Sequence, residues 1–248
     1  MRIAILCSPQ LDRFQQEVLA PIMDAPDIEI AGVLIDCRPR PSLKERFVKN
    51  LKRGRGGYML VMLAKRLAAR KVPSMPAVGY FSERGVACVE TRQPYSSVTL
   101  QKTAEMSADV MVMLGGFGIV KEPLLTMAPQ GILSYHHGDM RRYRGQPVGF
   151  WELYNNEKTM GVTVQRLSAG IDKGTPIAEK TIAIERGDTV ASLSQRALDN
   201  SVGMMLDALH KIQNPDFEPA VIDRYGSVYT IPNLRQYITL KVKLLFRK

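Results

Sequence analysis

Five short apolar runs constrain the fold more than any other feature of this 248-residue chain. The runs are RIAILC, IEIAGVLID, GVACVE, DVMVML and GILSY, and amphipathic segments such as QLDRFQQEVLAPIMDA and SSVTLQKTAEMSA lie between them. Apolar strands that alternate with helices are typical of βαβ units, in which a parallel sheet is buried on both faces. The sequence therefore predicts an α/β fold with parallel strands at residues 2–7, 28–35, 86–90, 109–114 and 131–135.

The second half of the chain predicts a smaller C-terminal lobe after these strands. Residues 146–157 favour a helix, and residues 160–184 favour two strands joined by a glycine-flanked turn at 168–174. Residues 187–212 predict one long helix. We expect residues 1–212 to form the main domain and residues 213–248 to form a C-terminal extension that includes a basic amphipathic helix.

A basic insert at about residues 38–75 interrupts the alternation of strands and helices. Its sequence predicts two helices hinged at Gly54–Gly57. Twelve Lys and Arg and a single acid, Glu45, lie between residues 38 and 71, and the last fourteen residues add five basic residues and no acid. The net charge of the whole chain is only +10, so its basicity is local. Two local patches indicate two contacts with anions and argue against a nucleic-acid-binding protein.

The composition also excludes several classes of protein. There is no stretch of eighteen or more uncharged apolar residues, so no membrane-spanning helix is expected. The opening MRIAILCSP is too short and too soon interrupted for a signal peptide. Cys7, Cys37 and Cys88 lie far apart without CxxC spacing, which predicts reduced thiols and neither a disulfide framework nor a metal site. We therefore expect a cytoplasmic protein, and we leave peripheral membrane contact open.

The stretch SYHHGDMRRYRG, at residues 134–145, holds two of the three histidines of the chain and follows an apolar strand. Ligands of parallel sheets bind at the carboxyl ends of the strands, where an imidazole can act as an acid, a base or a hydrogen-bond donor. Such a histidine needs a carboxylate to orient its ring. Asp172, in the turn AGIDKG, is the better candidate, and Asp139 is the nearer competitor in the sequence.

Several motifs occur together in an informative order. LGGFGIV follows one strand, SYH ends the next, and YRG, GVTV and GIDKG come after them. From about residue 86 to 212 the chain resembles the folate-dependent formyltransferase family, which includes enzymes acting on methionyl-tRNA, glycinamide ribonucleotide and amino sugars. The resemblance implies a Rossmann-like, mostly parallel sheet with a small C-terminal lobe. Counting back from Gly145 makes His136, not His137, the histidine that corresponds to the catalytic histidine of the family.

The resemblance also implies a reaction. N10-formyltetrahydrofolate would donate the formyl group to an amine, His136 would stabilise the tetrahedral oxyanion, and Asp172 would position His136 and relay the proton of the amine. We expect a His136 ring nitrogen within one bridging water of the Asp172 carboxylate, with both side chains facing one cleft. The folate would lie against two loops, mainly through backbone groups, with Phe117 as an apolar wall. The residues of these loops are Gly116, Phe117, Gly118, Ile119, Val120, Lys121, Ala169, Gly170 and Ile171.

The sequence departs from the family at Ser134, where members carry Asn. The Asn amide is a donor aimed at the oxyanion, and losing one such donor costs on the order of 3 kcal/mol. A Ser hydroxyl is shorter, but it can still donate a hydrogen bond, and His137 adds another donor nearby. We therefore include Ser134 with His136 and Asp172 as candidate catalytic residues.

Transfer to a small amine, most simply a nucleotide-linked amino sugar, is the first functional hypothesis. The alternatives are hydrolysis of formyltetrahydrofolate, because the double His resembles the deformylase branch, and a binding protein without catalysis. Transfer to methionyl-tRNA is not expected, because that branch continues into a C-terminal barrel domain that the segment 213–248 is too short to form. Three interpretations of the basic insert remain: an anion site for a nucleotide diphosphate, a membrane-facing surface or a solvated hairpin. Whether the protein forms a homo-oligomer is also left open.

Overall fold

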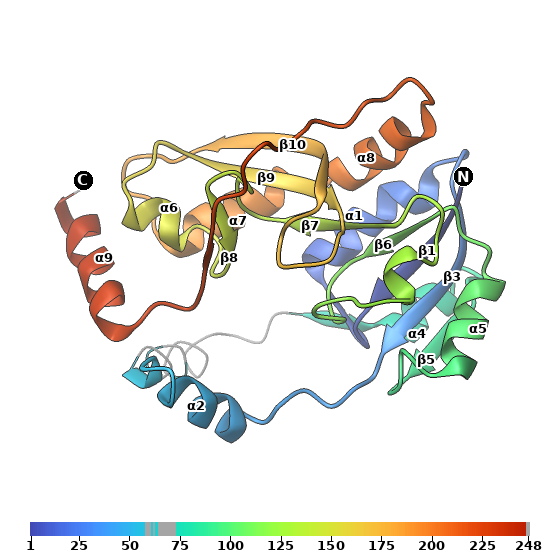
Figure 1. Cartoon of the computed structure of the whole chain (residues 1–248), viewed down its shortest axis with the longest axis horizontal. Helices are drawn as coiled ribbons and strands as arrows, with labels where there is room; N and C mark the ends of the chain where they lie inside the picture. Colours follow the sequence, from blue (N-terminus) through green and yellow to red (C-terminus); the bar gives the residue numbers. More distant parts are fainter. Residues whose placement is uncertain (58–60, 62, 64–72, 247–248) are drawn as a thin grey trace.

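The computed structural model describes residues 1–57, 61, 63 and 73–246. Within them a seven-stranded sheet, in the order β10-β9-β7-β6-β1-β3-β5, runs through the molecule, and helices cover it (Figure 1). The strands of this sheet are β1 (Arg2–Cys7), β3 (Glu29–Asp36), β5 (Cys88–Thr91), β6 (Val110–Met113), β7 (Ile132–His136), β9 (Thr159–Arg166) and β10 (Thr175–Ala183). Two small sheets pair β2 (Gln10–Asp12) with β4 (Ser74–Pro76), and β8 (Tyr143–Gly145) with β11 (Ser227–Tyr229).

The described helices fill the connections between the strands. They are α1 (Arg13–Asp24), α2 (Leu43–Leu51), α4 (Ala77–Ser82), α5 (Ser97–Glu105), α6 (Phe150–Tyr154), α7 (Val190–Asp199), α8 (Met204–Gln213) and α9 (Leu234–Phe246), with a 3-10 turn η1 (Leu124–Thr126). Their starts follow the sequence: Asp12 caps α1 and Ser42 caps α2, each in a reciprocal capping box. None of the described helices is both long and apolar enough to span a membrane.

The five predicted parallel strands are confirmed. β1 lies in the middle and pairs in parallel with β3 and β6, while β5 and β7 extend the sheet on either side in the same direction. β1 is buried on both faces, because Ile3, Ile5 and Cys7 join one apolar cluster while Ala4 and Leu6 join the other. The carboxyl ends of these strands therefore meet at one edge of the sheet, where His136 ends β7.

The predicted hairpin at residues 160–184 forms, but its position differs from the expectation. β9 pairs antiparallel with β7, and β10 pairs antiparallel with β9, so the hairpin extends the main sheet and is not part of a separate lobe. The reason is packing: Val162, Val164 and Ile177 are buried in the same apolar cluster as β1. After α8 the chain returns to pair β11 with β8 and to pack α9 against α6. We propose that residues 1–212 and 213–248 are the two units of the chain.

The single helix predicted at residues 187–212 is wrong, because the structure has α7 and α8 with a turn between them. Ser201 is fully buried in that turn, and its carbonyl accepts a hydrogen bond of 2.7 Å from the Tyr135 hydroxyl. The same hydroxyl accepts a bond from the Met205 backbone N–H, so Tyr135 takes the place of intrahelical partners. In the insert, α2 matches the first predicted helix, whereas the second, predicted after Gly57, falls mostly on residues 58–72, which lie outside the described residues.

Candidate active site

A histidine from β7 and an aspartate from the turn before β10 form the centre of the candidate site. His136 Nδ1 lies 3.4 Å from Asp172 Oδ2, so the two side chains are in direct contact without a bridging water. On the other side of the ring, Nε2 lies 2.9 Å from the carbonyl oxygen of Tyr143 in β8. Because both ring nitrogens face oxygen acceptors, the doubly protonated imidazolium satisfies both contacts.

The pKa of His136 follows from these neighbours. Burial, the largest influence, favours the neutral ring, but the Asp172 carboxylate and the Tyr143 carbonyl together raise the pKa of His136 above its ordinary value. The side chain of His136 is only 6% exposed. The site therefore favours the protonated form of a buried imidazole, and this preference depends on one carboxylate.

Asp172 is itself held by three groups. Its φ of +44° places it in the left-handed region, where the tight turn directs its carboxylate back toward β8. Oδ2 accepts a hydrogen bond of 2.8 Å from the Gly145 backbone N–H, and Oδ1 lies 3.5 Å from Gln165 Nε2. Burial would raise the pKa of Asp172, but the hydrogen bonds from His136, Gly145 and Gln165 lower it, so the carboxylate stays ionised.

The adjacent His137 does not belong to this pair. Its ring stacks on Tyr135, contacts the edge of Phe14, and lies 3.3 Å from the Ser201 hydroxyl. Burial and the neighbouring charge of His136 lower the pKa of His137 to about 4, so its ring is neutral near pH 7. The sequence placed His137 beside the site as an additional donor. The structure corrects this, because the ring packs against α1 and the turn after α7.

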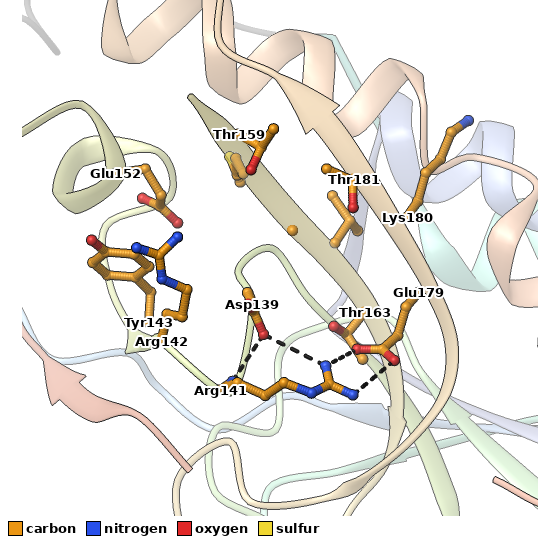
Figure 2. A pocket seen from close by; sticks show the side chains of 13 residues that line it. Asp139, Arg141, Arg142, Tyr143, Glu152, Thr159, Thr163, Glu179, Lys180 and Thr181 are labelled. Atoms are coloured by element: carbon orange, nitrogen blue, oxygen red, sulfur yellow. Dashed lines mark hydrogen bonds and ion pairs between the residues drawn. The ribbon is translucent and has the colours of Figure 1, made fainter. Parts of the chain in front are cut away.

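Asp139, the competing carboxylate, also lies elsewhere. It pairs with Arg141 and lines a separate cavity of about 250 Å³, where Arg141 also pairs with Glu179 (Figure 2). Glu152 of α6 lines the same cavity opposite that ion pair and is 3% exposed. Burial raises the pKa of Glu152 to about 7. No feature of the sequence singled out Glu152, because a single acid in a short amphipathic helix is usually solvated.

A larger cavity, of about 630 Å³, borders the His136–Asp172 pair. Asp172 lines it, whereas His136 lies behind Asp172, so the expectation that both side chains face the cleft is met only by the aspartate. His136 is kept out of the cavity because its ring is closely packed. Gly138 lies so near the ring that a Cβ added to Gly138 would be only 2.7 Å from His136 Nε2. The opposite wall is basic, and it is formed by Arg46, Lys49, Arg53 and Arg55 from α2 and the turn after it.

The predicted folate-binding residues divide between this cavity and the core. Gly118, Ile119 and Ile171 line the cavity, and the side chains of Ile119 and Ile171 are 61% and 45% exposed. Phe117 and Val120 are instead buried in an apolar cluster, so Phe117 does not provide the expected wall. The remaining four residues do not line the cavity: Gly116 lies against Ser8 at the end of β1, the Lys121 N–H donates to the Tyr95 hydroxyl, and Ala169 and Gly170 are exposed.

Ser134 is buried two residues before His136 on β7, so the two side chains point to the same face of the sheet. Its register partner on β9 is Gln165, which the sequence analysis did not select. Gln165 is 1% exposed, contacts Asp172 and accepts a hydrogen bond of 2.9 Å from the Gly174 N–H. A polar residue at a buried position of the strand GVTVQRL was the available signal. Among the described residues, no group of His, Cys, Asp and Glu is arranged to hold a metal ion.

The fold has clear counterparts among solved structures. An N-formyltransferase from Helicobacter canadensis, in complex with folinic acid and dTDP-3-aminofucose, superposes with a TM-score of 0.65 at 14% identity over 98% of this chain and 80% of that one. Glycinamide ribonucleotide transformylase 1 from Symbiobacterium toebii gives a TM-score of 0.60 at 18% identity over 90% and 94%. At these identities the likeness concerns the fold.

Sequence comparison gives the same family. A methionyl-tRNA formyltransferase from Trichormus variabilis is 28% identical over 131 residues, which is 53% of this chain and 39% of the relative. The chain spans between 34% and 58% of the length of the first three such relatives. The family model for formyl transferase matches residues 50–209, well over half of the sequence. Together with the site at the end of β7, this match establishes that the chain belongs to the formyl transferase family.

Proposed function

We propose that this protein transfers the formyl group of N10-formyltetrahydrofolate to the amine of a nucleotide-linked amino sugar. The observation that carries the proposal is the Asp172 carboxylate, which contacts His136 on one side and borders a cavity with a basic wall on the other. Formyl transfer to an amine needs a group that stabilises an oxyanion, a base for the proton of the amine, and room for two substrates.

The two residues would divide the chemistry between them. In the reaction, a bond forms between the acceptor nitrogen and the formyl carbon, and the bond from that carbon to N10 breaks. Asp172 faces the cavity and would accept the proton that the attacking amine loses, and a proton would be returned to N10 as tetrahydrofolate leaves. The His136 imidazolium would stabilise the developing oxyanion from behind Asp172. Turning its Nε2 away from the Tyr143 carbonyl would bring an N–H toward the cavity.

The residues around Asp172 fit a folate. Ile119 and Ile171 expose large apolar side chains to the cavity, and Gly118 and Gly145 leave backbone groups accessible beside them. Exposed isoleucines on two facing loops suit the faces of a flat heterocycle, while backbone groups suit its polar edge. The Helicobacter canadensis enzyme, which has the same fold, was solved with folinic acid, and this supports a reduced folate as the donor.

The basic wall supports a nucleotide-linked acceptor. Four Lys and Arg face the cavity from α2 and the turn after it, and Glu45 is the acid among the α2 residues that line it. Such a wall suits a diphosphate, because its phosphate oxygens accept charge-assisted hydrogen bonds from Lys and Arg. The complex with dTDP-3-aminofucose supports this class of acceptor by analogy of fold. The hydrolase alternative relied on the adjacent His137, whose ring packs away from Asp172.

The acceptor can be tested by following tetrahydrofolate release with a panel of dTDP- and UDP-linked amino sugars, glycinamide ribonucleotide, methionyl-tRNA and water alone. The proposal expects release to depend on a nucleotide-linked amino sugar. Arg46→Gln with Lys49→Gln should raise the KM for that acceptor about tenfold or more and leave the KM for the donor nearly unchanged. Lys44→Gln is the matched control, because Lys44 lies on the same helix but does not line the cavity.

Two results would contradict the assignment of the acceptor. Turnover with methionyl-tRNA alone would identify a different acceptor for the same chemistry. An increase of the donor KM in the α2 variant, without a change for the acceptor, would assign the basic wall to the folate tail.

A further inference from the structure

Helix α9 turns apolar side chains toward solvent on its outer face. Leu234, Ile238, Val242 and Leu245 are between 41% and 65% exposed, and Phe246 at its end is 84% exposed. At about 100° per residue, the first four lie within one narrow stripe along the helix. A helix packed on a protein core normally shows polar residues at these positions. The stripe therefore needs an explanation.

The inner face of α9 is already occupied. Leu240 is 1% exposed in the core, and Lys243 Nζ donates a hydrogen bond of 2.6 Å to the Tyr154 carbonyl while lying 4.7 Å from the centre of the Tyr154 ring. These contacts fix α9 on α6. The outer stripe cannot turn inward without breaking them, so it stays available on the surface.

Basic residues flank the stripe. Arg235 and Lys241 are exposed on its two sides, and the sequence from Leu234 to the end contains no acid. This arrangement, with apolar residues in the middle and cations at the edges, is typical of helices that lie in the interface of an anionic lipid layer.

Helix α2 repeats the pattern at the same end of the molecule. Its cationic side chains Arg46 and Lys49 face the cavity, whereas Leu43 and Leu51 are 49% and 57% exposed. The turn after α2 lies against the start of α9, since a Cβ on Gly57 would be 3.0 Å from the Leu234 Cβ. Figure 1 shows both helices at the end of the molecule away from α5.

We infer that the α2–α9 end of the protein binds the surface of an anionic lipid bilayer. The charge distribution favours lipid over a second copy of the chain: the described residues 38–57 and 234–246 hold eleven Lys and Arg and one acid, so two such ends would repel each other. An anionic bilayer has the complementary charge and accepts the apolar stripe in its interface. The inference does not depend on the proposed formyl transfer.

Co-sedimentation of the full chain with vesicles tests this inference. We expect binding to vesicles that contain phosphatidylglycerol, weak binding to pure phosphatidylcholine, and loss of binding at high salt. Ile238→Ser with Leu245→Ser should weaken binding about tenfold or more, because it removes the centre of the stripe. Val98→Ser with Val221→Ser is the matched control, since both valines are exposed elsewhere.

Charge variants provide a second, independent test. Arg235→Gln with Lys241→Gln should weaken binding to phosphatidylglycerol vesicles about tenfold, whereas Lys102→Gln with Lys158→Gln, at exposed positions elsewhere, should have little effect. Absence of binding by the unmodified protein would overturn the inference, and so would equal losses in the control variants. If the stripe variant instead converted a dimer to a monomer on size exclusion and left vesicle binding intact, the stripe would be an interface between copies.

Discussion

Asp172 connects three parts of the candidate site through one carboxylate. Oδ2 accepts the Gly145 N–H and contacts the His136 ring, and Oδ1 contacts Gln165. Asn has the same shape as Asp but no negative charge, so Asp172→Asn keeps the packing and removes the counter-charge of the imidazolium. We expect kcat for formyl transfer to fall about a hundredfold or more, with the KM for the donor changed only a few-fold.

Steady-state kinetics of Asp172→Asn measures this effect, and Asp139→Asn is its control. Asp139 lies in the other cavity, so its variant should keep nearly full kcat. If Asp139→Asn lost as much activity as Asp172→Asn, the assignment of the carboxylate would be wrong.

The same pair predicts a pH dependence of stability. The pKa of His136 is raised, so its contribution to the free energy of unfolding is full below the ordinary pKa of about 6.5 and is lost as the pH rises through the raised pKa. The pKa of Asp172 is lowered, so its contribution is full above about pH 3.9 and is lost as the pH falls through the lowered pKa. The difference in unfolding free energy between wild type and Asp172→Asn should therefore be largest between these two values.

Urea unfolding of both proteins from pH 3 to pH 9 tests this dependence. The difference should shrink on the alkaline side as His136 loses its proton. A difference that stayed constant, or grew up to pH 9, would show that the pair is not an ion pair in the folded protein.

At the residue level the sequence allowed part of the site to be predicted. His136 and Asp172 come together as expected, because the motifs that contain them fix a strand end and a tight turn. The adjacency of His137 to His136 in the sequence does not place the two side chains in the same site, since neighbouring side chains at a strand end face opposite sides of the sheet. Phe117 was assigned to the cavity from its glycine-rich loop, but it packs in the core, where a large apolar side chain is more stable.

At the level of elements, Gly145 joins the site to the C-terminal extension. Its φ is +92°, its N–H donates to Asp172, and its place in β8 is opposite Tyr229 of β11. A Cβ at this position would overlap the Tyr229 carbonyl oxygen. We expect Gly145→Ala to lower the free energy of unfolding by about 2–4 kcal/mol and to separate β11 from β8.

Chemical denaturation and hydrogen exchange at the Tyr229 amide would measure both effects. Gly187→Ala is the control: Gly187 has φ +84° but no atom within 4 Å of an added Cβ, so it reports the backbone strain alone. Equal losses in the two variants would mean that the contact with Tyr229 contributes nothing.

Helices and strands could be predicted where residues close together in the sequence determine them. Apolar runs located the five parallel strands, and α1 and α5 followed from amphipathic segments between them. The break between α7 and α8 was not predictable, because it depends on the Tyr135 hydroxyl, which comes from a strand far away in the sequence. The position of the β9–β10 hairpin was missed for a similar reason: antiparallel addition to β7 is decided by packing against the core.

At the scale of the whole molecule, the basic helices α2 and α9 and the cavity lined by Asp172 lie at one end. Arg46 and Lys49 of α2 line the cavity that Asp172 also lines, and the other face of the same helix is exposed beside α9. The arrangement accounts for a basic chain whose remaining surface is not basic. The two proposed roles are therefore separable: we expect variants of Arg46 and Lys49 in α2 to affect acceptor binding and variants of Ile238 and Leu245 in α9 to affect lipid binding.

The proposed formyl transfer is tested most directly by an experiment that follows the formyl group itself. The donor is N10-formyltetrahydrofolate labelled with carbon-13 in the formyl group, and the acceptor is a dTDP-linked amino sugar. Mass spectrometry of the acceptor follows the label. We expect one labelled formyl group on each acceptor amine, no labelled formate, and loss of the labelled product in Asp172→Asn. Labelled formate with an unmodified acceptor, or undiminished transfer by Asp172→Asn, would contradict this expectation.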